Sequence, residues 1–419
     1  MTLSQPRFPR SPTSSPHCEF IDSQGAFDEC MSLCLNSEYI AIDTEFVRTT
    51  TFYSNPGLFQ IAVANRILLV DPLAVQDLSP LARVLKSNET KKIMHAMGED
   101  IDLFKHSLKV LPENVFDTQI AAALVGIGPS IGYANLVNHL LSVELDKGET
   151  RSNWLQRPLT DRQKYYAAND VVYLVDLYHK LSSQLQQTGR KGIVEEECQR
   201  LIGVAETGSA PELYYLKMRG AWRLTRKRQV LLQRLCAWRE QTAMSLNKPR
   251  ARILPDAVLQ LIVEKMPSDR RELSVAAHQN QQAVHQFGQE ILEIINNRPL
   301  SDGGTEGRRT GATTGAGEKT EEDTLDNFLP IMPPLTPQEQ ALHKKLKSLV
   351  RTVARQSDFL PETLGNSKVL EEMVFKSCAA SKVVVPPFYQ GWRWEKIGRQ
   401  LSVVMQQYLD NRQSGMSSE

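Results

Sequence analysis

The chain has no long uncharged apolar segment. Its nearest approach is the run from Ala121 to Gly128, whereas a membrane-spanning helix needs roughly 18 such residues. The first 17 residues, MTLSQPRFPRSPTSSPH, hold four prolines and no apolar stretch. They lack the pattern of a signal peptide, and we expect a disordered tail over residues 1–17. With 23 glycines and 22 prolines in 419 residues, collagen-like repeats and wholesale disorder are excluded.

The six cysteines include no Cys-x-x-Cys pair. Cys30 and Cys34 are four residues apart, but no second pair of His or Cys residues stands elsewhere at ligand spacing. The pattern therefore argues against structural zinc and predicts reduced thiols in a cytoplasmic protein. The net charge does not indicate any class of partner, because 49 basic and 48 acidic residues leave only +1.

Residues 18–210 alternate strand-like and helix-like segments. Short apolar runs typical of buried strands occur at 39–43, 58–64, 67–70 and 92–95, the middle two joined at Asn65-Arg66 as a hairpin. Helices are expected at 79–87, 99–108, 117–126, 132–141 and 160–187, the last opening with the capping-box spacing of Thr160 and Gln163. Strands mixed with helices predict an α/β domain with a central sheet.

After residue 210 the strand signals nearly disappear. We expect a first helical domain at 215–300, a flexible linker at 301–328, a second helical domain at 329–412 and a tail at 413–419. Six glycines and five threonines between residues 301 and 320 support the linker. A cut there should break few buried contacts, so the second helical domain is expected to be removable.

The first chemical signal is the tripeptide Asp43-Thr44-Glu45 at the end of an apolar strand. Residues i and i+2 of a strand project from one face, so both carboxylates address one place. Holding two like charges together is costly unless a cation neutralises them. Taken alone, the tripeptide is equally compatible with a solvated strand end.

Two further segments carry similar signals. In His95-Ala-Met-Gly-Glu-Asp100 a strand passes into a helix, which places Asp100 in the first helical turn, where the helix dipole favours any anion. In the later helix, Tyr166 and Asp170 are four residues apart and share a face. Each signal has an ordinary structural explanation by itself. Together they supply hard oxygen ligands, which suit Mg²⁺ or Mn²⁺ rather than zinc.

These segments resemble the three motifs of the DEDDy 3′→5′ exonuclease family. The match rests on Ala41-Ile-Asp-Thr-Glu-Phe-Val-Arg48, on His95 to Asp100 and on Tyr166 to Asp170. More narrowly, the segments at 57–60, 116–119 and 152–159 are similar to the bacterial ribonuclease D family. The helical domains resemble paired helicase-and-RNase-D C-terminal (HRDC) domains, with Gly391-Trp-Arg393 in the second.

The resemblance implies a ribonuclease H-like exonuclease domain at 18–210, with a mixed central sheet and flanking helices, followed by two all-α HRDC domains. It implies that two divalent ions, Mg²⁺ or Mn²⁺, are held by four carboxylates, while Tyr166 orients the attacking water. The metal ligands would be Asp43, Glu45, Asp100 and Asp170. It also implies release of nucleoside 5′-monophosphates from the 3′ ends of tRNA precursors and other structured RNAs.

A strongly basic stretch lies at 217–252, with eleven Lys or Arg residues and one acid, Glu240. Such an asymmetry is typical of a surface that contacts the RNA backbone. Trp222 and Trp238 within it are interpreted as core residues rather than as platforms for bases. The residues proposed to bind RNA are Thr44, His95, Arg226, Lys227 and Arg228.

Gly315-Ala-Gly-Glu-Lys-Thr320 superficially resembles a phosphate-binding loop. Glu318 interrupts the required Gly-Lys-Ser/Thr order and no strand precedes the segment, so we expect no nucleotide cofactor. The protein is expected to be a monomer with no membrane partner. Two alternatives stay open on the sequence: a 3′→5′ exonuclease acting on DNA, and a non-catalytic RNA-binding scaffold. The complete set of motif residues argues against the scaffold.

Overall fold

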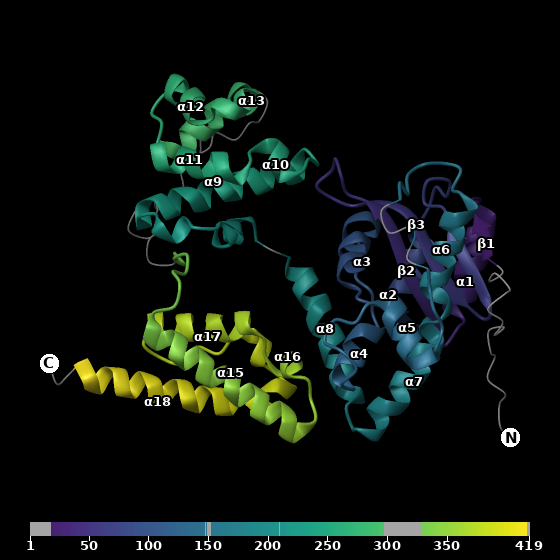
Figure 1. Ribbon diagram of the computed structural model, residues 1–419. Coiled ribbons are helices and arrows are strands. Elements are labelled where there is room, and N and C mark those ends of the chain that lie inside the picture. Colours follow the sequence, from purple (N-terminus) through teal and green to yellow (C-terminus); the bar gives the residue numbers. More distant parts are fainter. Residues whose placement is uncertain (1–17, 147, 149–151, 209, 297–327, 417–419) are drawn as a thin grey trace, which may run out of the picture. The chain divides into compact units, whose positions relative to one another are not determined.

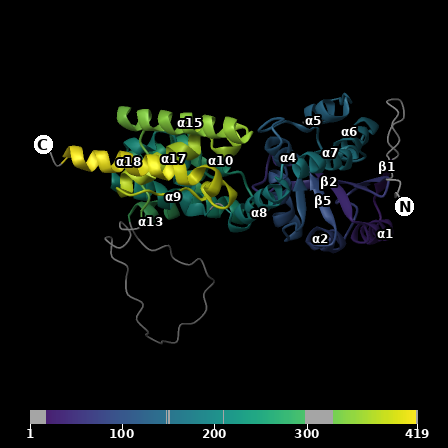
Figure 2. The same ribbon diagram turned by 90° about the horizontal axis from the view of Figure 1, so that it is seen from below.

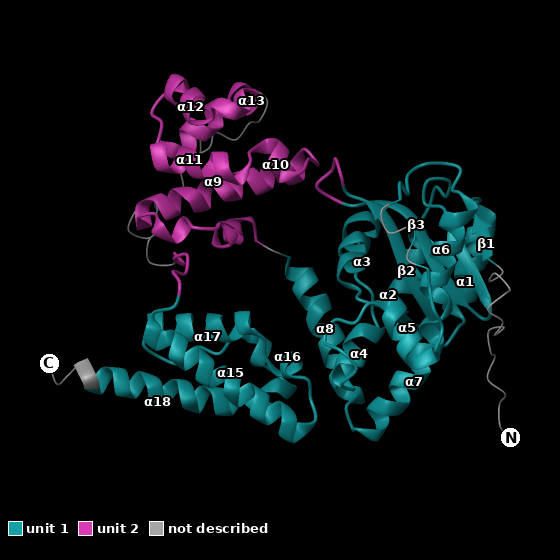
Figure 3. Ribbon diagram, in the orientation of Figure 1, with its two compact units in different colours: residues 1–48, 54–208, 335–419 teal, residues 49–53, 209–334 magenta. Residues whose placement is uncertain are grey.

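The computed structural model of the chain describes residues 18–146, 148, 152–208, 210–296 and 328–416 (Figure 1). The predicted tail at 1–17, residues 301–327 of the predicted linker and residues 417–419 lie outside the described residues. Two compact units are formed (Figure 3). Unit 1 contains described residues of 18–48, 54–208 and 335–416, and unit 2 those of 49–53, 210–296 and 328–334. No helix in the described ranges is long and apolar enough to cross a membrane.

Unit 1 is built on a six-stranded mixed sheet in the order β1-β4-β3-β2-β5-β6. Strands β2, β3 and β4 are antiparallel neighbours, whereas β1, β5 and β6 each pair in parallel. The strand bounds are β1 (Cys18–Ile21), β2 (Tyr39–Val47), β3 (Asn55–Val63), β4 (Arg66–Val70), β5 (Lys91–Met94) and β6 (Val115–Asp117). The predicted α/β fold with a mixed central sheet is confirmed.

The hairpin between β3 and β4 turns one residue earlier than predicted. Val63 pairs with Arg66, so Ala64 and Asn65 form a two-residue loop, and both have a positive φ, 47° and 66°. Two positive φ values in succession match the twist of the flanking strands. Strands β1 and β6 were not predicted. They are four and three residues long, too short for a clear alternation of apolar and polar residues.

Helices cover both faces of the sheet, with α1 and α2 on one face and α4 to α7 on the other (Figure 2). Their bounds are α1 (Gln24–Leu35), α2 (Ser79–Lys86), α3 (Gly98–Leu103), α4 (Thr118–Leu124), α5 (Tyr133–Leu141), α6 (Asp161–Val172), α7 (Leu174–Gln187) and α8 (Lys191–Thr207). The helix predicted at 99–108 consists of α3 and a π-helical turn, Phe104–Leu108.

The helix predicted at 160–187 is in fact two helices that meet at Tyr173. The Tyr133 hydroxyl donates to the Asn169 carbonyl (2.9 Å) and accepts from the Tyr173 amide (3.2 Å). A side chain that enters the backbone ladder in this way breaks a helix. The predicted start was correct, because Thr160 and Gln163 form a complete capping box.

Unit 2 is an all-helical bundle, as predicted for the first helical block. Its helices are α9 (Arg226–Ser245), α10 (Arg250–Ile253), α11 (Asp256–Lys265), α12 (Arg270–Ala276) and α13 (Gln281–Ile295). Leu232, Leu235, Leu259 and Ile291 are fully buried in its core. Trp238 is also buried, with its indole N–H donating to Glu290 (2.7 Å). The prediction that this tryptophan belongs to the core is confirmed.

The second helical block consists of α15 (Pro337–Ser357), α16 (Pro361–Leu364), α17 (Ser367–Ala380) and α18 (Arg399–Met416). Leu342, Leu346 and Val350 are buried along α15, at the amphipathic spacing predicted for this helix. The block shares one continuous hydrophobic core with the exonuclease-like part of unit 1. The expectation that it is a freely removable domain is therefore wrong.

Two buried arginines join the second helical block to the rest of unit 1, and neither contact could be predicted from the sequence. Arg393 reaches from the second helical block to Glu197 of α8, where Nη2 lies 2.9 Å from Oε2, and the Trp392 indole donates to the same carboxylate (2.8 Å). Arg190, which directly precedes α8, reaches into the second helical block. It donates to the Ser357 carbonyl at the end of α15 (2.9 Å) and lies 4.0 Å from the centroid of the Phe359 ring. Pairings across more than 160 residues leave no pattern in local sequence.

Replacing Arg393 with Met should lower the free energy of unfolding by about 3–5 kcal/mol, because the buried Glu197 carboxylate loses its cation. The side chains of this pair are only 5% and 6% exposed. Arg399→Met is the matched control, since the Arg399–Glu395 pair is 63% and 61% exposed and should contribute no more than about 1 kcal/mol. Urea titration followed by circular dichroism measures both. Equal effects of the two substitutions would contradict the assigned role of Glu197.

Candidate active site

Strand β2 supplies the first two carboxylates. Asp43 and Glu45 are two residues apart on β2, and both pair with β3, while β5 pairs with the preceding part of the strand at Tyr39–Ala41. The ladder fixes the backbone, so both side chains emerge on one face. A register shift between Glu45 and Phe46 follows at once, and such bulges commonly re-aim side chains beside active sites. Both acids remain partly exposed.

The third carboxylate lies in the first turn of α3, as predicted. After β5, the loop at 95–97 is held by the Asp117 carboxylate, which accepts from the amides of Ala96 (3.2 Å) and Met97 (2.9 Å). This anchor sets the start of α3, and therefore the position of Asp100. The Thr44 hydroxyl then donates to Asp100 Oδ1 at 2.5 Å.

Helix α6 brings the remaining two residues. It packs across β2, β3 and β4, and its first turn is fixed by the capping box. Tyr166 and Asp170 are one turn apart, and the Tyr166 hydroxyl donates a hydrogen bond to the Asp170 carboxylate. The buried Trp154 ring lies beside Tyr166, with the two centroids 6.2 Å apart.

The electrostatics show that the four carboxylates form one cluster. Burial and the neighbouring charges of Asp100, Asp170 and Glu45 raise the pKa of Asp43 well above its usual range. Burial, with Asp170 and Asp100 nearby, raises the pKa of Glu45 to about 9. Burial alone raises the pKa of Asp170 to about 7, against an opposing hydrogen bond from Tyr166, and burial raises that of Asp100 to about 7 despite its bond from Thr44.

Tyr166 keeps its proton at neutral pH. Burial, together with the charges of Asp170, Glu45 and Asp43, raises the pKa of its hydroxyl far above the normal value. The side chain therefore acts as a hydrogen-bond donor and acceptor rather than as a base.

The donor set fits a hard divalent cation. Four carboxylates supply only oxygen ligands, and no Lys or Arg is among the charges that shift the pKa of Asp43, Glu45 or Asp170 in the described chain. Their negative charge is therefore left for a bound cation to neutralise. The cluster is not preformed, however, because no three His, Cys, Asp or Glu side chains among the described residues are arranged around a common metal position.

The residues predicted to contact RNA fall into two groups, one in unit 1 and one in unit 2. Thr44 is buried and engaged with Asp100. His95 is half-buried at the end of β5, and its Nδ1 lies 2.9 Å from the Thr118 hydroxyl. Arg226, Lys227 and Arg228 begin α9 in unit 2, where the first two are exposed.

Tyr133 is a site neighbour that the sequence analysis missed. Its ring packs edge-on against His95, and burial together with the charges of Asp170 and Asp43 raises the pKa of its hydroxyl. The Asp117 anchor was likewise missed as a positioning group, although it stands in the segment at 116–119 that carried part of the family resemblance.

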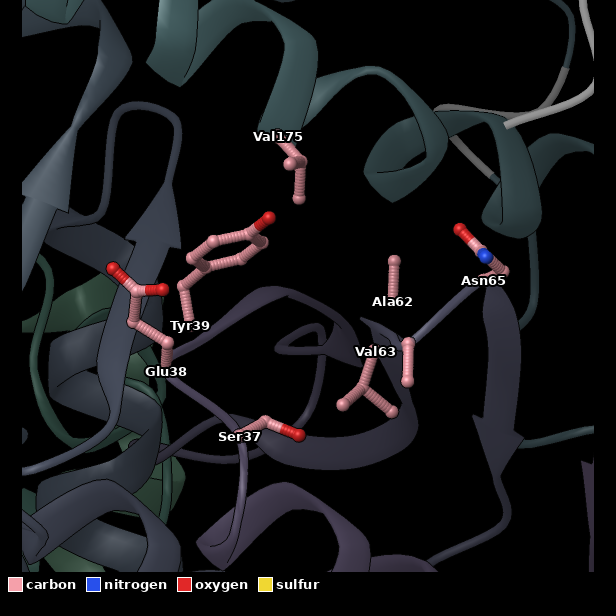
Figure 4. Close-up of a pocket in the computed structure, with 8 residues that line it drawn as sticks. Ser37, Glu38, Tyr39, Ala62, Val63, Asn65 and Val175 are labelled. Atoms are coloured by element: carbon pink, nitrogen blue, oxygen red, sulfur yellow. The ribbon is translucent and has the colours of Figure 1, made fainter. Parts of the chain in front are cut away.

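A separate hollow of about 200 Å³ lies at the opposite end of β2, around Tyr39 (Figure 4). It is lined by Ser37, Glu38, Tyr39, Ala62, Val63, Ala64, Asn65 and Val175. A single carboxylate, that of Glu38, stands among these residues. The hollow therefore has none of the charge clustering that marks the site at the other end of the strand.

Comparison with known families identifies both the part of unit 1 that carries the carboxylates and the helical bundle of unit 2. Residues 18–186 match the 3′–5′ exonuclease family and residues 228–295 match the HRDC domain. Ribonuclease D of Pseudomonas paraeruginosa is 31% identical over 388 residues, which cover 93% of this chain and 97% of that protein. Ribonuclease D of Haemophilus influenzae is 34% identical over 286 residues, or 67% and 71% of the two chains.

Solved structures agree with these matches. The crystal structure of Escherichia coli RNase D, described as an exoribonuclease involved in structured RNA processing, superposes with a TM-score of 0.79 at 26% identity. It covers 94% of this chain and 99% of that one. The catalytic core of RRP6 from Trypanosoma brucei shares the fold, with a TM-score of 0.57 at 21% identity over 70% and 83% of the two chains.

Without metal, the protein should become less stable as the pH rises from 6 to 9. The unfolded chain loses these carboxyl protons near pH 4, whereas the folded chain retains them up to about pH 7 at Asp100 and Asp170 and about pH 9 at Glu45. The folded state thus binds more protons in this interval, and stability falls with pH. We expect the Tm in EDTA to be several degrees lower at pH 8.5 than at pH 6.

Asp43→Asn should remove part of that decline, because the raised pKa of Asp43 itself contributes to it and an amide does not titrate. Asp102→Asn, on the exposed side of α3, should leave it unchanged. Differential scanning fluorimetry at the two pH values measures both variants. A wild-type Tm that rises between pH 6 and pH 8.5 would contradict the clustering of the carboxylates.

Proposed function

The chain belongs to the ribonuclease D family and is a 3′→5′ exoribonuclease, and we propose that it trims the 3′ ends of tRNA precursors and other structured RNAs. The products would be nucleoside 5′-monophosphates. The observation that carries this proposal is the cluster of Asp43, Glu45, Asp100 and Asp170, in which the neighbouring carboxylates raise the pKa of Asp43 and Glu45, with Tyr166 hydrogen-bonded to Asp170. These five residues are proposed as the catalytic set.

Two divalent ions, Mg²⁺ or Mn²⁺, are proposed to be held by the four carboxylates. When bound, such a pair supplies an activated water and neutralises the charge that develops on the departing 3′ oxygen. The chain's own contribution is to fix the ligands: the ladder with β3 holds the backbone of Asp43 and Glu45, and Thr44 orients Asp100.

Tyr166 is proposed to position the attacking water. Its protonated hydroxyl is already bonded to Asp170, so its direction is set before substrate arrives. The nearby Trp154 ring limits its movement. A hydroxyl fixed in this way can accept a hydrogen bond from a water without removing its proton.

The RNA backbone is proposed to contact unit 2. Arg226, Lys227 and Arg228 lie at the start of α9, where Lys227 is exposed. A groove between α12 and α13, about 700 Å³ in volume, adds Arg270, Arg271 and His285 to the basic surface and includes no carboxylate. Its lining residues are Arg270, Arg271, Ser274, Gln281, Gln282, Val284 and His285. A groove lined by basic side chains and by no carboxylate suits phosphate groups.

Part of the basic stretch at 217–252 serves the fold instead. Arg239 is fully buried and pairs with Asp256 (2.7 Å). Arg250 forms two hydrogen bonds with the Glu240 carboxylate, at 2.7 and 2.8 Å. The prediction that the whole stretch faces RNA is therefore too broad, and we restrict it to the exposed residues.

The remaining proposals concern organisation. The second helical block is proposed to be another HRDC domain, which the coverage of 94% by Escherichia coli RNase D supports. The protein is proposed to be a monomer. The six cysteines, all unpaired, support the reducing environment of the cytoplasm.

Activity on a 3′-extended tRNA and on a DNA of matched sequence tests the substrate proposal. With Mg²⁺ present, wild-type protein should shorten the tRNA from its 3′ end and release 5′-monophosphates, identified by mass spectrometry. Asp43→Asn should lower kcat by at least about a thousandfold while RNA affinity and the folded state persist, because an amide is a poor ligand for a hard cation. Faster turnover of DNA than of RNA would favour the alternative of a DNA exonuclease.

Tyr166→Phe should behave differently from Asp43→Asn. The ring still packs against Trp154, and only the hydroxyl is lost, so kcat should fall by about 10–1,000-fold with Mn²⁺ affinity retained. Calorimetric titration of Mn²⁺ into both variants measures this contrast. A large loss of Mn²⁺ affinity in Tyr166→Phe would mean that the tyrosine supports the ligands rather than the water.

Charge reversal of Lys227, Arg270 and Arg271 to Glu should weaken RNA binding and flatten its salt dependence. Each lost phosphate contact should reduce the slope of log K against log salt by about 0.7 for single-stranded RNA and about 0.9 for a duplex. Lys382→Glu, exposed in unit 1, is the control for net charge. Fluorescence anisotropy between 50 and 300 mM salt measures the slope. An unchanged slope would place the RNA contacts elsewhere.

A further inference from the structure

Gln60 is a fully buried polar residue in the middle of the sheet. Its side chain has no exposed surface, and in the described part of the chain neither Nε2 nor Oε1 has a hydrogen-bond partner. An amide buried in this way destabilises a fold. Unsatisfied polar groups are uncommon in native interiors and call for an explanation outside packing.

Its position supplies that explanation. Gln60 of β3 pairs directly with Asp43 of β2 in the antiparallel ladder. Residues opposed in this way project to the same face, with their Cβ atoms about 4.5–5.5 Å apart. Helix α6, which carries Tyr166 and Asp170, packs over β2, β3 and β4 on this face. The Gln60 amide is therefore a direct neighbour of the Asp43 carboxyl group.

The two other aspartates of the cluster, Asp100 and Asp170, already accept hydrogen bonds from side-chain hydroxyls. Thr44 donates to Asp100, and Tyr166 donates to Asp170. Asp43 accepts a hydrogen bond from the Thr44 backbone amide, but within the described residues it has no side-chain donor. Of the three, only Asp43 lacks a side chain to set the direction of its carboxylate, and the residue opposite it carries two unused N–H groups.

We propose that Gln60 is a positioning residue for Asp43. When the site is loaded with metal, this free amide N–H would donate to one oxygen of the Asp43 carboxylate and leave the other oxygen for the metal. A glutamine has three rotatable side-chain torsions, so the amide can reach a carboxylate at this Cβ separation. A Glu here would add a fifth negative charge, and a Lys would compete with the divalent cation. A neutral donor avoids both effects. This inference rests on the proposed metal-dependent activity.

The test replaces the amide without changing the shape of the site. Gln60→Met keeps the length of the side chain and removes every donor. Leu69→Met is the matched control, because Leu69 is fully buried and flanks Gln60 on its other side, in β4. Three quantities are measured: Mn²⁺ affinity by calorimetry, the Tm in EDTA, and kcat and KM on 3′-extended RNA.

Gln60→Met should weaken Mn²⁺ binding and lower kcat, each by about 10–100-fold, the usual effect of removing a group that orients a metal ligand. Its KM should stay within twofold of wild type, and its Tm in EDTA should be unchanged or higher because an unpartnered amide is gone. Leu69→Met should leave Mn²⁺ affinity and kcat at wild-type values.

Wild-type Mn²⁺ affinity and kcat in Gln60→Met, or equal losses in Leu69→Met, would overturn the inference and leave Gln60 as a packing residue. If Gln60→Met does not fold, Gln60→Asn decides: weaker Mn²⁺ binding with normal KM supports the role, and wild-type values refute it. A wild-type protein that degrades neither RNA nor DNA would refute the proposed function instead, while the calorimetric comparison would still test the contact with Asp43.

Discussion

Mutual repulsion among Asp43, Glu45, Asp100 and Asp170 is the constraint on which the rest of unit 1 depends. Burial and these neighbouring charges raise the pKa of Asp43, so the fold holds together groups that would separate if their backbones were free. Each is accordingly fixed by a rigid element. β2 is paired with β3 along Asp43 and Glu45, α3 starts from a loop held by Asp117, and α6 begins at a capping box. The hydrophobic core on both faces of the sheet supplies the opposing free energy.

The distribution of cations in unit 1 follows from the same constraint. Described arginines of unit 1 form ion pairs with acids other than these four, among them Arg66 with Glu19, Arg157 with Asp71, and Arg393 with Glu197. An arginine beside Asp43 would relieve the repulsion permanently and occupy the place of a metal ion. Neutral donors, the hydroxyls of Thr44 and Tyr166, serve the acids instead. The fold thus keeps its strongest ion pairs for structure and leaves the site electrostatically incomplete.

The parts of this arrangement that the sequence predicts are those encoded locally. Asp43 and Glu45 follow from strand alternation, Asp100 from a strand-to-helix transition, and the start of α6 from its cap. What could not be predicted depends on distant residues. The break at Tyr173 is caused by Tyr133, forty positions away, and the docking of the second helical block depends on Glu197 and Arg393. Arg239 lies in the basic stretch predicted to face RNA, but it is fully buried and pairs with Asp256, seventeen residues further along the chain.

The proposed site would act on the scissile phosphodiester, which RNA and DNA share, so four carboxylates and a tyrosine do not by themselves distinguish the two polymers. Selection of structured RNA must therefore depend on contacts beyond the reacting phosphate. Phosphate contacts supply affinity and register but little sequence information, which suits an enzyme that trims many different 3′ ends. The exposed basic residues of unit 2 have this character, because Arg270 and Arg271 line an open groove rather than a closed pocket for one base. Under the proposed function, hydrolysis and RNA retention would use separate surfaces with opposite charge. A dense negative cluster that requires cations would repel the RNA backbone if it had to hold the substrate as well.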